Sequence, residues 1–198
     1  MEKGETATNP RTGAGFQVTA TPEIGSGTGV LEIRRVLRPG MGFPVPHVHL
    51  DFVERWTVDR GVADAWVGHR RLRLAASDAF VVPPRTTHVN PCNRSMGDLI
   101  LRQAFEPATE GVNRYVDTLA EHLREERDYR GELPLATALA LLDTRDPQTY
   151  APRVPHVLQR RIVFPLARSV RQWREERRFL RDEEKKAAEA GPGYWADE

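Results

Sequence analysis

Apolar residues alternate with polar ones along most of the first half of the chain. Side chains on a strand point alternately to its two faces, so this period of two predicts short, half-buried β-strands. Glycine-rich and polar turns separate these segments. The predicted strands cover residues 16–21, 30–37, 52–58, 62–67, 71–74, 79–82 and 98–105. Many short strands with regular turns predict a closed antiparallel β-barrel or jelly roll over residues 15–107.

The pattern changes to the period of an α-helix after Gly111. Apolar residues then recur three or four positions apart, which predicts a helix with one apolar face. The residues of this face are Val112, Tyr115, Val116, Leu119 and Leu123. A second short helix is predicted over residues 135–142, and a third apolar segment, divided by Pro165, begins at Pro155. Residues 111–190 are therefore predicted to form a helical C-terminal region.

The two ends of the chain lack such a period. Residues 1–14 are rich in Thr, Gly, Glu and Asn and are predicted to be a mobile arm, and residues 191–198 a loose tail. The 198 residues include 39% hydrophobic and 29% charged residues, and a single cysteine excludes an internal disulfide framework. Neither a signal-peptide pattern nor a long apolar run is visible, so we expect a cytoplasmic protein.

Positive charge is concentrated in the third apolar segment. Residues 153–186 hold 11 Lys and Arg against 5 Asp and Glu. A basic amphipathic helix can lie on an anionic membrane surface. Acidic residues interrupt this basic face, however, so we expect the apolar stripe to pack against the barrel or a second subunit, with a homodimer favoured. The net charge of only +1 argues against nucleic-acid binding.

Three histidines and a glutamate have the spacing of a metal site. His47 and His49 are two residues apart and therefore point to the same side of a strand. Glu54 follows five residues later, and His88 follows further predicted strands. Nitrogen and oxygen donors of this kind favour Fe(II), Mn(II), Ni(II), Cu(II) or Zn(II) over calcium. Asp51 is a rival ligand, but Glu54 is favoured because five residues leave room for the chain to turn into the next strand.

These residues lie in two segments that resemble the signatures of the cupin superfamily. Residues 40–61 contain a glycine, H-x-H, four residues, a glutamate, six residues and a second glycine. Residues 77–88 resemble the second signature, with Pro83 in a matching position. The resemblance covers about half of the chain and implies a small antiparallel barrel. It also implies that the metal ligands on the inner wall of this barrel are His47, His49, Glu54 and His88.

The chain departs from the cupin signatures mainly at turns. Ser77 and Arg85 stand where the family usually has glycines. These positions affect the shape of the turns rather than the donor atoms. The predicted metal site is therefore unchanged by them.

The residues available inside the predicted barrel narrow its chemistry. It contains no tyrosine to act as an acid and no lysine to form a Schiff base, so any chemistry is expected to belong to the metal. We favour an Fe(II)-dependent oxygenase that acts on a small organic molecule. The alternatives are a non-catalytic metal-dependent binding or sensing barrel and a Lewis-acid isomerase. An isomerase would need a further proton-transfer group, and few candidates are present.

Several residues are candidates for the wall of a substrate pocket. Trp56 lies two residues beyond Glu54 and shares its face of the strand. Arg35 shares strand parity with apolar neighbours, so it can point inward and pair with a substrate carboxylate, although arginines more commonly extend to solvent. Core packing is at least as good an interpretation for each aromatic residue. The candidates are Phe43, Phe52, Trp56, Phe80 and Arg35.

Overall fold

The chain folds into β-strands followed by helices. The computed structural model describes residues 1–22, 29–42, 46–125, 149–152, 155–163, 165–166 and 169–170. The strands are β1 (Thr6–Thr8), β2 (Gly15–Ala20), β3 (Leu31–Leu37), β4 (Val48–His49), β5 (Val53–Arg60), β6 (Ala63–Val67), β7 (Arg70–Leu74), β8 (Ala79–Val82), β9 (His88–Asn93), β10 (Leu99–Glu106) and β11 (Thr149–Tyr150). The helices are α1 (Glu110–Glu125), α3 (His156–Leu158) and the π-helical η1 (Gln159–Val163).

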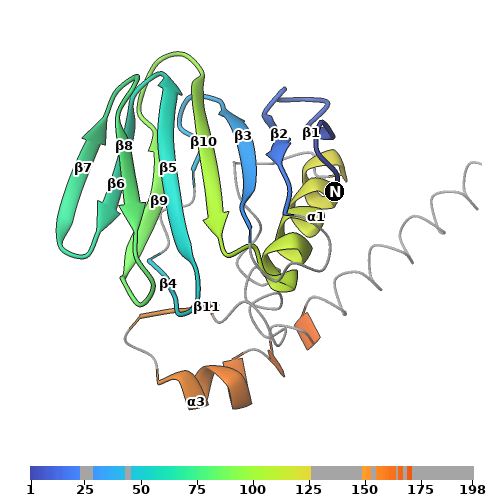
Figure 1. Cartoon of the computed structure of the whole chain (residues 1–198), viewed down its shortest axis with the longest axis vertical. Coiled ribbons are helices and arrows are strands. Elements are labelled where there is room, and N and C mark those ends of the chain that lie inside the picture. The colour runs from blue at the N-terminus through green and yellow to red at the C-terminus, as the bar shows by residue number, and fades with distance from the viewer. Residues whose placement is uncertain are drawn as a thin grey trace, which may run out of the picture.

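The strands pair into antiparallel sheets (Figure 1). A six-stranded sheet has the order β1-β2-β3-β10-β5-β8, a three-stranded sheet the order β7-β6-β9, and β11 pairs with β4. A closed barrel is therefore not seen, because the described strands form separate sheets rather than one continuous ladder, but the mostly antiparallel sheets agree with the jelly roll, the other form of the prediction. One reason is that β4 has only two residues. Pro46, which precedes it closely, has no backbone N–H to extend the pairing.

The two larger sheets enclose an apolar core. On β5 the buried residues are Glu54, Trp56 and Val58, as a period of two requires. The same alternation occurs on β3, where Arg35 takes one of the buried positions. The buried apolar residues that the two sheets share are Leu37, Trp56, Val58, Ala63, Ala65, Leu74, Val82, Leu99 and Leu101. Two charged residues, Glu54 and Arg35, are thus carried into the interior by strands that are otherwise apolar on this face.

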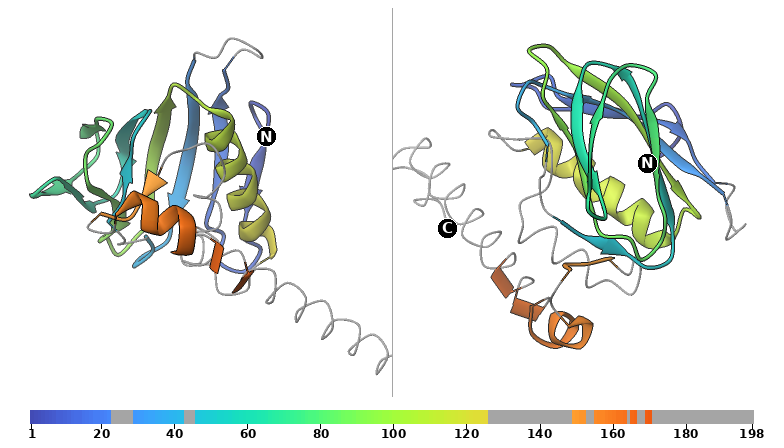
Figure 2. Two further views of the ribbon diagram at one scale, coloured as in Figure 1. Left: turned by 90° about the horizontal axis from the view of Figure 1, so that it is seen from below. Right: turned by 90° about the vertical axis from the view of Figure 1, so that its left-hand side faces the viewer.

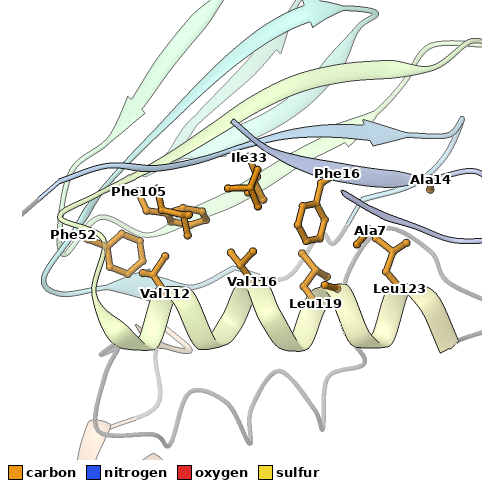
Figure 3. Close-up of a cluster of buried hydrophobic side chains, with 13 residues drawn as sticks. Ala7, Ala14, Phe16, Ile33, Phe52, Phe105, Val112, Val116, Leu119 and Leu123 are labelled. Carbon is orange, nitrogen blue, oxygen red and sulfur yellow. The ribbon is translucent and has the colours of Figure 1, made fainter. Parts of the chain in front are cut away.

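Helix α1 covers the part of the six-stranded sheet that lies towards β1 (Figure 2). Its predicted apolar face is buried except for the half-buried Tyr115, which confirms the helix expected after Gly111. Figure 3 shows these side chains pointing from the helix towards the sheet. The principal members of this cluster are Phe16, Ile33, Phe52, Phe105, Val112, Val116, Leu119 and Leu123. The cluster reaches Phe52, which stacks on His49, and so connects the helix to the strand β4 that carries this histidine.

Within the predicted mobile arm of residues 1–14, Thr6–Thr8 form a strand of the six-stranded sheet. β1 pairs with β2, with Ala7 opposite Phe16. The buried Asn9 donates its side-chain amide to the carbonyl oxygen of Leu123 on α1, at 2.9 Å. The apolar contribution of this segment is mainly small alanines, Ala7 and Ala14. These give too weak an alternation to be recognised as a strand in the sequence.

Two turns adopt a left-handed backbone without glycine. The φ angle of Ser77 is 75° and that of Arg85 is 65°. These are the two positions where the cupin signature usually has glycine. The turn shape is therefore retained, although a residue with a Cβ atom is strained by about 1–2 kcal/mol in this conformation.

We predict that Ser77→Gly stabilises the protein. Removing the Cβ atom relieves the left-handed strain, but glycine also makes the unfolded chain more flexible, which opposes this gain. The net increase in the free energy of unfolding should be about 0.5–1 kcal/mol. Urea unfolding measures this change. Ala76→Gly is the matched control, because Ala76 is the exposed neighbour and has no positive φ, so it should destabilise the protein. Equal effects of the two substitutions would contradict the prediction.

The C-terminal segment exposes the apolar residues that were predicted to pack against the barrel or a second subunit. Val157, Leu158, Ile162, Leu166 and Val170 are 42–63% exposed in the single chain. In the single chain these residues are therefore not covered by the barrel, and the side chain buried in this segment is that of Gln159. Packing on a second subunit stays a prediction. The predicted helix 135–142, Trp173 and the tail 191–198 lie outside the described residues, and no helix within the described part of the chain is long and apolar enough to cross a membrane.

Candidate metal centre

Backbone pairing places His47 opposite His88. The two residues form an antiparallel bridge in which each N–H donates to the carbonyl oxygen of the other, at 3.0 Å. Directly opposed residues project to the same side, and the two ring centroids lie 4.1 Å apart. His49, on β4, points the same way as His47, and its ring centroid lies 4.5 Å from that of His88. The two signature segments therefore bring their histidines together.

Glu54 reaches the histidines from β5. Its Oε2 atom lies 3.1 Å from Nε2 of His88 and 3.5 Å from Nε2 of His49, and the two nitrogens are 3.2 Å apart. Adjacent ligands at about 2.1 Å from one ion are separated by about 3.0–3.4 Å in octahedral or tetrahedral geometry. The three donor atoms thus have the spacing of neighbouring ligands.

His47 lies on the more exposed side of the cluster. The ligand atoms of His47, His49 and His88 all lie within 4.8 Å of one another, and His47 is half-buried whereas the other two are buried. The rival ligand Asp51 is half-buried in the bend between β4 and β5. The choice of Glu54 as the fourth ligand stays a prediction, supported by its contacts with His49 and His88.

The orientation of His88 suits a metal ligand. Its Nδ1 atom lies 3.1 Å from the carbonyl oxygen of Thr86 and donates its proton to it, so in the neutral ring Nε2 presents a lone pair. The Nε2 atom of His49 faces that of His88, and the imidazole ring of His49 stacks on Phe52 with centroids 4.0 Å apart. Two lone pairs that face each other repel unless a proton or a cation lies between them. The donor set therefore fits a bound divalent ion.

Glu54 is ionised in this site. In the metal-free site, burial by itself raises the pKa of its carboxyl group, but hydrogen bonds from His49 and His88, together with the positive charge of these rings when both nitrogens are protonated, outweigh burial and hold the pKa well below its usual range. A carboxylate that stays charged in the interior can offset the charge of a metal ion. A metal ion bound at the two Nε2 atoms would replace these protons and favour the charged carboxylate in the same way.

A buried chain of polar side chains leads away from Glu54. Gln103 on β10 donates its Nε2 to Glu54 Oε1 at 2.5 Å, and Arg35 on β3 donates its Nη1 to Gln103 Oε1 at 3.0 Å. All three residues are at most 2% exposed. Gln103 is not among the site residues predicted from the sequence. The available signal was strand parity, since Gln103 is a polar residue between Leu101 and Phe105 on the inward face of β10.

The predicted pocket residues lie close to the site or in the core beside it. Phe52 packs between His49 and the cluster at α1, and the buried Trp56 stacks on Phe80 with centroids 6.4 Å apart. Core packing, the alternative interpretation, accounts for these positions of Phe52 and Trp56. Phe43 lies outside the described residues. A role for any of them in substrate binding stays a prediction.

A segment from beyond α1 pairs with β4, the strand that carries His49. β11 lies antiparallel to β4, with the buried Tyr150 opposite Val48. Gln159 forms two hydrogen bonds with Ala151, the residue after Tyr150. The backbone N–H of Ala151 donates to Oε1 of Gln159 at 2.9 Å, and Nε2 of Gln159 donates to the carbonyl oxygen of Ala151 at 2.8 Å. Opposed residues share a side, so Tyr150 lies on the Val48 side of β4 and not on that of His49. The predicted helical region 111–190 therefore also contains a strand.

Comparisons with known proteins identify similar solved structures. Neither a protein-family model nor a curated protein matches the chain. KdgF from Halomonas sp. is 21% identical with a TM-score of 0.42, over 52% of this chain and 89% of that one. An RmlC-like cupin from Shewanella frigidimarina is 23% identical with a TM-score of 0.41, over 54% and 86% of the two chains. A predicted oxalate decarboxylase from Thermotoga maritima is 17% identical with a TM-score of 0.44, over 53% and 92%.

Proposed function

We propose that this chain is a metal-dependent cupin protein and that, with Fe(II) bound, it acts as an oxygenase on a small organic molecule. The main support is the triangle formed by Nε2 of His49, Nε2 of His88 and Oε2 of Glu54, whose sides are 3.1–3.5 Å long. Two histidines and one carboxylate on one face of Fe(II) are typical of non-haem oxygenases and leave other positions open. His47 supplies a fourth donor from the more exposed side.

Each residue around this triangle has a distinct task. Bound iron would supply the redox chemistry with dioxygen. The carboxylate of Glu54 offsets positive charge, and the carbonyl oxygen of Thr86 keeps the Nε2 lone pair of His88 directed at the site. The ring of Phe52 covers one face of His49 and excludes water there.

The groups placed beside the ligands favour an oxygenase over an isomerase. The ligands touch the amide of Gln103, the carbonyl oxygen of Thr86 and the ring of Phe52. None of these three groups exchanges a proton with a substrate near neutral pH, whereas an isomerase needs such an exchange. An oxygenase reaction centred on the metal does not need a protein group that exchanges a proton with the substrate.

Nitric oxide binding tests the proposal with no substrate present. The purified protein is loaded with Fe(II) under anaerobic conditions, its metal content is measured, and nitric oxide is added as an analogue of dioxygen. We expect about one iron per chain and the EPR signal of an iron–nitrosyl complex. Bound iron without this signal would contradict the oxygenase and favour the non-catalytic binding barrel. Oxygen-uptake measurements with small aromatic and carboxylic compounds then identify the substrate class.

A further inference from the structure

We propose that Gln103 is a positioning residue that fixes how Glu54 is presented to the metal, and that the buried Arg35 fixes Gln103 in turn. The inference deepens the proposed function, because it rests on the metal site. It concerns residues that supply no ligand themselves. Its consequence is that metal affinity and coordination geometry depend on a side chain of β10, a strand that carries none of the histidines.

The two carboxylate oxygens of Glu54 have different neighbours. Oε1 accepts the hydrogen bond from Gln103, at 2.5 Å. Oε2 faces the nitrogens of His88 and His49, at 3.1 and 3.5 Å. A carboxylate with one oxygen engaged by a short hydrogen bond offers the other to a metal. Gln103 therefore holds Glu54 as a ligand through Oε2 alone.

Strand register makes this arrangement a fixed property of the sheet. Arg35 on β3 is opposite Leu101 of β10, and Glu54 on β5 is opposite Phe105 of β10. Gln103 lies two residues from each of these positions, so it shares their face and is a diagonal neighbour of both Arg35 and Glu54. The three side chains form a line across three adjacent strands.

Arg35 determines which end of the Gln103 amide faces Glu54. An amide side chain has an oxygen that accepts and a nitrogen that donates, whereas a guanidinium group only donates. Arg35 donates to Gln103 Oε1 at 3.0 Å, which leaves the amide nitrogen towards Glu54. A flipped amide would place oxygen against the carboxylate and nitrogen against the guanidinium. Both contacts would be repulsive in an interior that screens charge poorly.

Cobalt binding to Gln103→Met tests the inference. Methionine is similar in size to glutamine but cannot donate to Glu54. We expect Co(II) to bind 10–100-fold more weakly, as loss of a group that orients a ligand typically causes. Competition with a chromophoric chelator measures the affinity, and the visible absorption of bound Co(II) reports a changed coordination geometry. Gln17→Leu, at an exposed position on β2, is the control and should match the wild type in both measurements.

A double variant separates positioning from a purely structural role. Gln103→Met alone leaves the buried Arg35 without this acceptor, which lowers stability. Arg35→Met combined with Gln103→Met removes the buried charge as well, so thermal unfolding of the metal-free protein should recover towards the wild type. The hydrogen bond to Glu54 is still absent from the double variant. Its Co(II) affinity should therefore stay 10–100-fold reduced and its spectrum altered.

Each outcome decides the inference. Wild-type Co(II) affinity and spectrum in the double variant would overturn it, because Gln103 would then serve only stability. If Gln103→Met does not fold, the double variant alone gives the answer by the same criterion. Failure of the wild-type chain to bind Co(II) would instead overturn the proposed metal function itself.

Discussion

Replacing His88 with alanine should abolish stoichiometric metal binding. His88 is the residue that touches every other part of the site: its backbone pairs with His47, and its Nε2 atom lies 3.2 Å from His49 and 3.1 Å from Glu54. Without its imidazole, the remaining donors lose the ligand that closes the triangle from β9. Metal content after anaerobic loading with Fe(II) and dialysis should fall from about one ion per chain to a small fraction of that value.

His69→Ala is the matched control for this substitution. His69 is an exposed histidine in the turn between β6 and β7, so its removal changes the histidine count but not the site. It should leave the metal content unchanged. The double variant His49→Ala with His88→Ala is the strictest test. Full metal content in this variant would refute the predicted site.

The strands predicted from the sequence are those in which turn residues bound a short segment that mixes apolar and polar residues. β3 and β5 alternate between buried and more exposed positions, β10 does so in its first half, and each was predicted within two residues at both ends. β9 was not predicted, because all six of its residues are buried and the segment contains Pro91. A strand that is covered on both faces has no period of two to detect.

The ligands were predictable for a different reason. The resemblance to a family signature covers the spacing of His47, His49, Glu54 and His88. Their proximity in the fold therefore did not have to be derived from packing. Gln103 is absent from that signature and becomes visible only when the parity of its strand is followed. A single polar residue among apolar ones is easily taken for an outward-facing position.

Other features depend on contacts between distant parts of the chain. β11 pairs with β4 across about a hundred residues, and a two-residue strand leaves no periodic signal. The exposed apolar residues of the C-terminal segment were predicted to be buried because periodicity identifies an apolar face but not its partner. A second subunit that packs there stays a prediction.

Glu54→Gln should weaken metal binding by 10-fold or more, whereas Asp51→Asn should leave it unchanged. The first substitution removes the negative charge that offsets the cation. Its effect should be enlarged by Gln103, whose amide nitrogen requires an oxygen at the position of Oε1. The new side-chain nitrogen is then directed at the two histidines, in place of Oε2, and an amide nitrogen carries no lone pair available to a metal.

Competition titration with Co(II) at fixed pH measures both variants. Asp51→Asn is a matched control, because it makes the same carboxylate-to-amide change three residues earlier in the chain. Weak binding by Asp51→Asn together with normal binding by Glu54→Gln would transfer the ligand role to Asp51. It would also require the bend before β5 to turn the Asp51 carboxylate towards His49 and His88, since the present arrangement directs Oε2 of Glu54 at these nitrogens.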